Sequence, residues 1–336
     1  MSARKPSLFC GLRLQVVDAD SNEDDMIKDV NKIAVLGAGL IGSSWAALFL
    51  ASGRSVSVFD PAGKAEEAVR NFVESALLDI ERLGFAKLKN SDALEFCKSA
   101  AEAVKGANFV QESVPEDLAT KIGVYREIES CIEDDAVVAT SSSGLTLTEL
   151  QRGWRDPSRL VLGHPFNPPH LIPLVEVMGN DRTSASSVEL AQKFYESVGK
   201  VTIRLRKEVP GHVANRLQAA VWREAIHLAK EGVASVEDID KAVAFGPGIR
   251  WAVMGPSTLF HLAAGEGGIA EFCQRYASSF HRWWEDLGDA KLDQDTRRML
   301  LNGVGKANDG NEIEHLAMER DAKLLAILDA IAKFNK

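Results

Sequence analysis

The chain of 336 residues is poor in cysteine and has no excess of positive charge. Its four cysteines are scattered, with no Cys-x-x-Cys pair and no His-rich tract, which argues against a disulfide scaffold and against a structural zinc or other metal site. Acidic residues outnumber basic ones by 48 to 39, a net charge of −9, and no basic block occurs. Such a chain is a poor candidate for binding nucleic acid or anionic lipid.

A long apolar run is also missing. The longest stretch, from Trp45 to Ala51, stops at Ser52, well short of the ~18 residues that span a bilayer, so we expect no membrane segment. Residues 1–30 lack periodicity and mix basic residues with an acidic cluster, unlike a secretory or transit peptide, which predicts a loose N-terminal extension. With cysteines that fit a reducing compartment, these features predict a soluble cytoplasmic protein.

Hydrophobic patterning divides the remaining chain into two parts. From residue 31 to 208, short apolar runs alternate with helical stretches, which predicts a Rossmann-type doubly wound α/β domain with helices on both faces of a mostly parallel sheet. A helical pair is expected over 64–104. Residues 209–336 contain only helical patterns, with a break at Gly246-Pro247-Gly248, and predict an all-helical second domain. The expected strands are 33–36, 55–59, 109–112, 136–140, 160–162, 174–178 and 201–205.

A glycine-rich turn follows the first expected strand. Its sequence, Gly37-Ala38-Gly39-Leu40-Ile41-Gly42, has the form G-x-G-x-x-G and opens a helix. Gly37 permits a tight turn, Gly39 lets the backbone approach a pyrophosphate, and Gly42 lets the helix pack closely on the strand. The helix N-terminus at Leu40 and Ile41 supplies N–H donors and a partial positive charge. A glycine turn that merely packs is the alternative.

Asp60 favours the dinucleotide interpretation. It stands 18 residues beyond Gly42, at the end of the second expected strand. There its carboxylate would accept hydrogen bonds from the adenosine ribose hydroxyls and repel a 2′-phosphate. The sequence therefore predicts NAD, rather than NADP, as the cofactor.

Three reactive side chains stand at or just beyond the ends of later strands. Ser143 follows the strand at 136–140, His164 lies in a proline-rich segment expected to be a loop, and Glu176 interrupts an apolar strand. An unpaired buried carboxylate is very costly, and His164 is the obvious partner for Glu176. A His–Glu pair makes a general base, which predicts a dehydrogenase in which His164 removes a hydroxyl proton. A Ser–His–Glu hydrolase is disfavoured because Ser143 lacks a Gly-x-Ser-x-Gly elbow.

These motifs occur in the order found in the 3-hydroxyacyl-CoA dehydrogenase superfamily, which the chain resembles from about residue 32 to 268. The segments that carry the resemblance, besides the glycine turn, are Ser-Ser-Ser-Gly-Leu at 141–145, Gly-His-Pro-Phe-Asn-Pro-Pro at 163–169, Leu-Val-Glu-Val at 174–177 and Val-Ala-Asn-Arg-Leu at 213–217. The resemblance implies that an L-3-hydroxy acid is oxidised by NAD and that the helical domain, residues 209–336, forms a homodimer.

The resemblance also implies roles for single residues. His164 would be the base and Glu176 its partner, with Ser143 and Asn215 positioning the substrate oxygen. Further residues match family positions near the nicotinamide and its ribose, namely Glu116, Lys121 and Asn167.

Within the superfamily, one segment departs from the enzymes that act on CoA thioesters. Residues 246–256 contain extra residues, among them Arg250 and Trp251. This variation resembles the branch that contains lambda-crystallin (L-gulonate 3-dehydrogenase) and L-carnitine dehydrogenase, which act on free hydroxy acids. An arginine offers a bidentate fork to a carboxylate, and a tryptophan offers an apolar or cation–π surface. Arg250 on a surface and Trp251 in a core remain the alternative.

Three functions stay open at this point. The favoured one is NAD-dependent oxidation of a small free L-3-hydroxy acid. A 3-hydroxyacyl-CoA substrate is second; six basic residues against seven acidic ones between 61 and 100 argue weakly against it, because CoA phosphates favour a basic patch. A non-catalytic, crystallin-like structural role is the third, and the complete Ser143, His164, Glu176 and Asn215 set argues against it.

Overall fold

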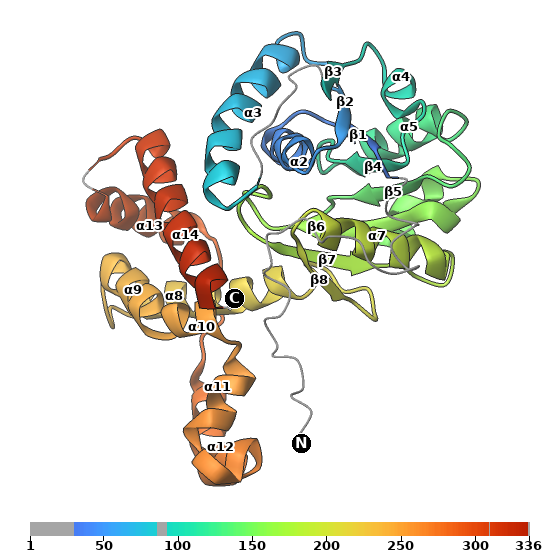
Figure 1. The fold of residues 1–336 in the computed structure, drawn as a ribbon. Helices are drawn as coiled ribbons and strands as arrows, with labels where there is room; N and C mark the ends of the chain where they lie inside the picture. The colour runs from blue at the N-terminus through green and yellow to red at the C-terminus, as the bar shows by residue number, and fades with distance from the viewer. Residues whose placement is uncertain (1–29, 86–92, 309, 335–336) are drawn as a thin grey trace. The chain divides into compact units, whose positions relative to one another are not determined.

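The computed structural model describes residues 30–85, 93–308 and 310–334 (Figure 1). The predicted extension at residues 1–30 lies, except for Val30, outside this range. By packing, the described residues form two compact units: one runs to Val213 and resumes at Arg320, and the other comprises Ala214–Glu319. The hydrophobic pattern did not indicate that the chain from Arg320 onward groups with the sheet.

The first unit is built on one eight-stranded sheet. Its strand order is β3-β2-β1-β4-β5-β6-β7-β8, and every neighbouring pair is parallel except β6–β7. The order reverses between β1 and β4, which is the point where doubly wound sheets bind nucleotides. The strands are β1 Lys32–Leu36, β2 Ser55–Phe59, β3 Leu94–Phe96, β4 Phe109–Glu112, β5 Val137–Thr140, β6 Leu160–Pro165, β7 Leu174–Met178 and β8 Val201–Arg204.

Helices cover both faces of this sheet, as predicted (Figure 1). Alternate strand residues face opposite sides: Ile33 and Val35 pack with α2, α3 and α7, whereas Ala34 and Leu36 pack with α4, α5 and α6. All four side chains are fully buried, which is why the strands read as continuous apolar runs. The helices are α2 Leu40–Ala51, α3 Ala65–Arg82, α4 Ala100–Val104, α5 Leu118–Ile128, α6 Leu147–Leu150 and α7 Ala185–Ser197.

Two local predictions were wrong. The expected helical pair over 64–104 is instead α3, the edge strand β3 and the short helix α4. A strand of three residues is too short for its alternation to stand out from helical spacing. His164 was expected in a loop, but β6 continues through Pro165, which pairs with Val175. Proline is tolerated there because it is the last residue of the strand, where its missing N–H interrupts no further pairing.

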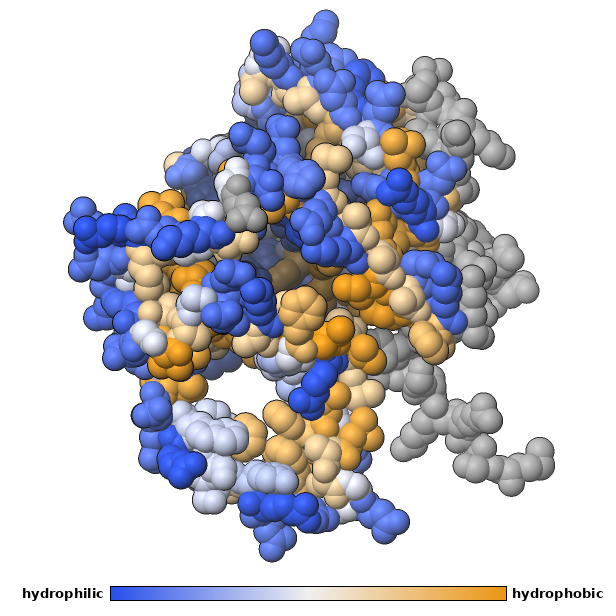
Figure 2. Space-filling model, turned by 90° about the vertical axis from the view of Figure 1, so that its left-hand side faces the viewer, coloured by the Kyte–Doolittle hydropathy of each residue, from blue (hydrophilic) through white to orange (hydrophobic). Residues whose placement is uncertain are grey.

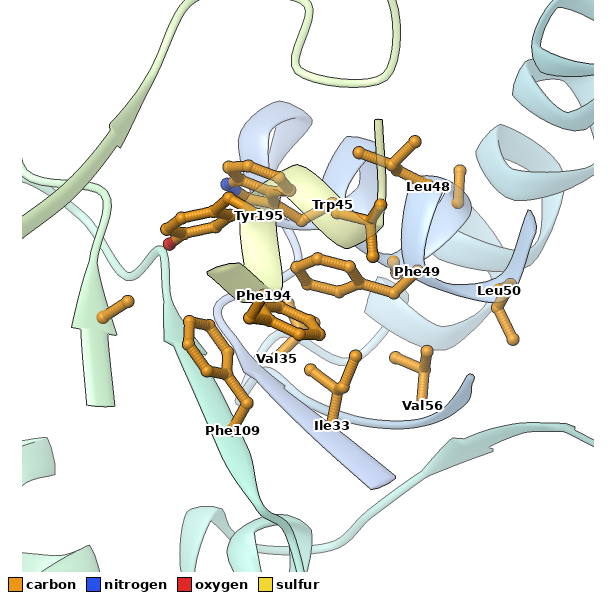
Figure 3. Close-up of a cluster of buried hydrophobic side chains, with 14 of the residues drawn as sticks. Ile33, Val35, Trp45, Leu48, Phe49, Leu50, Val56, Phe109, Phe194 and Tyr195 are labelled. Carbon is orange, nitrogen blue, oxygen red and sulfur yellow. The ribbon is translucent and has the colours of Figure 1, made fainter. Parts of the chain in front are cut away.

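An aromatic cluster joins α2 and α7 to the sheet (Figure 3). Trp45 and Phe49 of α2 stack with ring centroids 5.2 Å apart, and Phe109 of β4 lies 4.2 Å from Phe194 of α7. Tyr195, also on α7, contacts the Trp45 ring at 5.4 Å. All five side chains are fully buried. The helix that follows the glycine turn is therefore fixed to the strand at the centre of the sheet.

Tyr195 also restricts the strand that carries His164. Its hydroxyl donates a hydrogen bond of 2.6 Å to the side-chain oxygen of Gln111 on β4. A Cβ atom on Gly163 would overlap that hydroxyl. Glycine is therefore required immediately before His164 by close packing.

The second unit is helical, as predicted, and buries few apolar side chains. Among its described hydrophobic residues, Ile226 and Ile239 alone are buried. Apolar side chains lie at the surface in the lower part of Figure 2, where α11 and α12 lie, and those of Trp283 and Trp284 are 50% and 61% exposed. Its helices are α8 Ala214–Lys230, α9 Val236–Val243, α10 Ile249–Val253, α11 Pro256–Ala263, α12 Gly268–Asp286, α13 Gln294–Ala307 and the start of α14, Ile313–Phe334.

The predicted break at Gly246-Pro247-Gly248 falls within a kinked π-helical turn, Ala244–Gly248, between α9 and α10. Gly246 there has non-helical backbone angles. In the part of the chain that the structure describes, no helix is both long and apolar enough to pass through a bilayer.

The packing of Gly163 against Tyr195 gives a stability prediction with a matched control. We expect Gly163→Ala to lower the free energy of unfolding by about 1–3 kcal/mol, because the added methyl group overpacks a filled site. Gly123→Ala should raise it by about 0.5–1 kcal/mol, since Gly123 lies inside α5 with no neighbour among the described residues within 4 Å of the added atom. Urea denaturation of both variants measures the opposite signs; equal stability of Gly163→Ala and the wild type would contradict the packing argument.

Candidate active site

The glycine turn lies between β1 and α2, at the switch point of the sheet. Gly37 has φ +91°, and a Cβ atom on it would overlap the Ser113 carbonyl; one on Gly42 would overlap the Gly37 carbonyl. A Cβ on Gly39 would have no atom of the described residues within 4 Å. Packing of the turn thus explains Gly37 and Gly42, whereas Gly39 keeps space open beside the N-terminus of α2. That space and the helix amides fit the pyrophosphate of a dinucleotide.

Asp60 follows β2 and is bonded to this turn. Its Oδ2 accepts the N–H of Ala38 at 2.8 Å, and its Oδ1 accepts the N–H of Ala62 at 2.9 Å. Each carboxylate oxygen has two lone pairs, so this arrangement leaves acceptor capacity for ribose hydroxyls. The carboxylate is oriented by backbone donors before any ligand is present.

His164 and Glu176 are direct partners across the antiparallel β6–β7 pair. His164 Nδ1 lies 2.7 Å from Glu176 Oε2, and Glu176 Oε1 accepts the N–H of Val213 at 2.9 Å. The Glu176 side chain is completely buried and that of His164 is 6% exposed. A carboxylate can only accept, so Nδ1 carries the proton and Nε2 carries a lone pair. This is the tautomer that a general base requires.

Glu116 shapes the serine loop, residues 141–145, which follows β5. Its Oε1 accepts the Ser142 hydroxyl at 2.7 Å and the N–H groups of Ser143 and Gly144 at 3.0 and 2.6 Å. Burial acts to raise the pKa of Glu116, but the hydrogen bonds from Ser142 and Gly144 and the Lys121 charge outweigh it and lower the pKa. The ionised carboxylate therefore holds the half-buried Ser143 in place.

Lys121 is buried beneath Glu116. Its Nζ donates to Glu112 Oε1 at 2.7 Å and stands 3.7 Å from Glu116 Oε2; the Lys121 side chain is 1% exposed and that of Glu112 fully buried. Glu112 Oε2 also accepts the hydroxyls of Tyr125 and Thr140. Burial and the Glu112 charge raise the pKa of Tyr125 well above its ordinary value.

Sequence reasoning missed Glu112, Tyr125 and Thr140. The one available signal was a carboxylate at the end of the buried strand 109–112, which needs donors just as Glu176 does. It also missed His212, whose buried ring lies 5.1 Å from that of His164.

The remaining predicted residues lie apart from this cluster or in the other unit. Asn167 is exposed just after β6, and Leu40 is 55% exposed in the first turn of α2, beside Ile41. Asn215 lies on α8, while Arg250 and Trp251 lie on α10, in the helical unit. No cluster suited to hold a metal occurs among the described residues.

Family comparison gives this geometry its context. Residues 32–209 match the NAD-binding domain of 3-hydroxyacyl-CoA dehydrogenase, and residues 211–300 match the C-terminal domain of the same family. The chain belongs to the 3-hydroxyacyl-CoA dehydrogenase family. It is an NAD-dependent oxidoreductase that acts on a small molecule.

Individual relatives narrow the resemblance. L-carnitine dehydrogenase of Streptomyces coelicolor is 44% identical over 308 residues, covering 92% of this chain and 97% of its own length. That of Pseudomonas putida is 38% identical, covering 91% and 95%. Among solved structures, the NAD-dependent 5-formyl-3-hydroxy-2-methylpyridine 4-carboxylic acid 5-dehydrogenase superposes with TM-score 0.78 at 30% identity, covering 90% and 98%. The 3-hydroxyacyl-CoA dehydrogenase of Archaeoglobus fulgidus gives 0.61 at 27%, covering 89% and 99%.

Lys121 has two possible roles, as the buried charge partner of Glu112 or as a direct ligand of the cofactor, and its burial favours the first. We expect Lys121→Met to lower the free energy of unfolding by about 3–5 kcal/mol, because Glu112 would be left as an uncompensated buried charge. Lys241→Met is the control, since Lys241 forms an exposed pair with Glu237 on one helix, worth at most about 0.5 kcal/mol. Thermal melting compares the two. An unchanged melting temperature with a raised KM for NAD would instead make Lys121 a direct cofactor ligand.

Proposed function

We propose that this protein oxidises the 3-hydroxyl group of a free L-3-hydroxy acid of the carnitine kind to the 3-keto acid, with NAD as the hydride acceptor. The observation that carries the proposal is the buried His164–Glu176 pair at 2.7 Å, in the unit that carries the glycine turn and Asp60. Relatives named L-carnitine dehydrogenase, 37–44% identical over most of the chain, support the substrate class.

The protein side of the reaction is proton removal. His164 Nε2 takes the proton of the 3-hydroxyl, and the carboxylate of Glu176 stabilises the resulting imidazolium through Nδ1–H. NAD, when bound, supplies the acceptor for the hydride that leaves C3. The reaction removes one proton and one hydride from the alcohol. The hydroxyl proton passes to His164, and the hydride carries both electrons away from C3. Ser143 and Asn215 orient the substrate oxygen by hydrogen bonding.

Residues at the carboxyl ends of the first strands would hold the cofactor. The amides at the N-terminus of α2, residues 39–42, would hold the pyrophosphate, because the N–H groups of Gly37 and Ala38 are already bonded to Phe59 and Asp60. Asp60 would bind the adenosine ribose and exclude a 2′-phosphate. Glu116 and Asn167 would contact the nicotinamide and its ribose. Lys121 acts there through Glu116, since its own ammonium is buried on Glu112.

Two neighbouring residues of α10 would bind the two charged ends of the substrate, Arg250 its carboxylate and Trp251 its quaternary ammonium. Arg250 is exposed, and the Trp251 side chain is 41% exposed. A guanidinium binds a carboxylate through two parallel hydrogen bonds, and an indole face attracts a quaternary ammonium. A molecule such as carnitine carries both groups, which supports this assignment over a CoA thioester.

We also propose that the protein is a cytoplasmic homodimer formed through the helical unit. That unit buries few of its apolar residues, and exposed apolar surface of this extent is typical of an interface. Light scattering of the purified protein would reveal twice the chain mass; a monomer at micromolar concentration would contradict the proposal.

The base is tested by substitution at the His–Glu pair. We expect His164→Gln to lower kcat by at least ~10²-fold, the usual scale for a positioned general base. Glu176→Gln should lower it less, because the imidazole stays in place without its charged partner. Binding of NAD, followed by tryptophan fluorescence, is the control and should change little. Full turnover in His164→Gln would exclude it as the base.

The identity of the substrate is tested by assaying the wild type and Arg250→Met on a panel of four compounds. L-carnitine, L-gulonate, L-3-hydroxybutyrate and L-3-hydroxybutyryl-CoA are each assayed by NADH absorbance, with NADP in parallel. We expect the free acids to be oxidised with NAD, and Arg250→Met to lower kcat/KM for them about tenfold to a hundredfold, the value of a charge-assisted hydrogen bond. A strong wild-type preference for the thioester, or equal rates with NADP, would contradict the proposal.

A further inference from the structure

One residue of the site adopts a costly conformation that packing alone does not explain. His212 has φ +51°, the only positive φ of a non-glycine residue in the described part of the chain. This left-handed region favours glycine, and a histidine held there is over-determined by its surroundings. Its side chain is nevertheless buried, with 2% of its surface exposed. A strained backbone that buries a polar ring indicates that the ring has a role in the site.

The ring makes one hydrogen bond, to the serine loop. His212 Nε2 lies 3.1 Å from the backbone carbonyl oxygen of Ser142. A carbonyl can only accept, so Nε2 carries the proton and Nδ1 holds a lone pair. Nδ1 is buried and has no hydrogen-bond partner among the described residues. Among the described residues, the bond to the Ser142 carbonyl is therefore the one hydrogen bond that orients the ring.

The neighbouring amide contacts the catalytic pair. The Val213 N–H donates to Glu176 Oε1 at 2.9 Å, while Glu176 Oε2 holds His164. The dipeptide His212-Val213 therefore binds the serine loop with its side chain and the His–Glu pair with its backbone. Glu116 binds the same loop by accepting the N–H groups of Ser143 and Gly144, whereas His212 binds it by donating to the Ser142 carbonyl.

We propose that His212 is a positioning residue that ties the serine loop to the His164–Glu176 pair and so sets the Ser143 hydroxyl against the base. The proposal rests on the function proposed above for the same site. A clamp of this kind matters because a misplacement of about 1 Å can cost ~10²-fold in rate. In the proposed reaction, Ser143 and His164 act on the same substrate oxygen, so their separation must be held.

The clamp works with a neutral ring. Burial lowers the pKa of His212, and the nearby His164 acts in the same direction, whereas the Ser142 carbonyl, Glu176 and Glu116 oppose them. The net direction is down, which keeps the ring uncharged at neutral pH. A neutral His212 adds no positive charge beside the imidazolium that forms on His164.

Three substitutions separate hydrogen bonding from packing. His212→Gln places an amide N–H where Nε2 stood, His212→Asn places one near Nδ1 instead, and His212→Phe keeps the ring without either nitrogen. We expect kcat to fall about tenfold to a hundredfold in the Phe and Asn variants, and to return to within about threefold of wild type in the Gln variant. KM for NAD should change little in all three. Thermal melting reports whether each variant folds.

The ranking of the variants decides the outcome. Phe equal to or better than Gln would mean that the ring only fills space and would overturn the proposal. If the Phe variant fails to fold, the Gln and Asn variants, which place the amide differently, are compared instead. A kcat of the Asn variant equal to or above that of the Gln variant would then overturn the proposal.

A second measurement does not depend on the substrate. Nitrogen chemical shifts of 15N-labelled histidines in the full-length protein, assigned with the variants above, should identify His212 as the Nε2–H tautomer and His164 as the Nδ1–H tautomer. A His212 protonated at Nδ1 would overturn the clamp even if no hydroxy acid is oxidised. Conversely, the expected tautomer in a protein inactive on the whole panel would retain the clamp and reject the proposed reaction.

Discussion

The buried carboxylate of Glu176 is the constraint on which the site depends. A carboxylate without solvent must accept hydrogen bonds from the protein, and its donors include His164 and the Val213 amide. The pairing follows from the one antiparallel contact in the sheet, β6–β7. A slip of one residue would turn Glu176 to the opposite face. The register of β6 on β7, together with the packing of Gly163 against Tyr195, thus determines that His164 faces Glu176.

The same rule explains the other end of the site. Glu112 is as buried as Glu176 and takes its donors from Lys121, Tyr125 and Thr140, which come from α5 and β5. Glu116, above it, is partly exposed and takes its donors from the serine loop. Networks with every member satisfied make a polar interior rigid. The loops at the carboxyl ends of the strands are therefore held before substrate arrives.

What could be predicted from the sequence was whatever depends on local spacing. The glycine turn, the alternation of strands and helices, and the need of Glu176 for a partner follow from neighbouring residues or from one buried charge. His212 was missed because its partner, Ser142, lies 70 residues away. Glu112 was missed although Lys121 lies only nine residues away, because nothing in the local pattern shows that the two side chains turn toward each other. The strand β3 was missed because three residues carry too little pattern.

In the proposed function, the base lies in the first unit, whereas the residues assigned to the substrate, Asn215, Arg250 and Trp251, lie in the second. His164, Glu176 and the serine loop depend on buried hydrogen bonds, and we expect substitutions there to cost stability. Arg250 and Trp251 lie exposed in the helical unit, where most substitutions cost little. Relatives whose names refer to carnitine, a pyridine carboxylic acid and a CoA thioester share this fold. Under the proposed function, substitutions at Arg250 and Trp251 would change the preference for substrate while the buried His164–Glu176 pair stays in place.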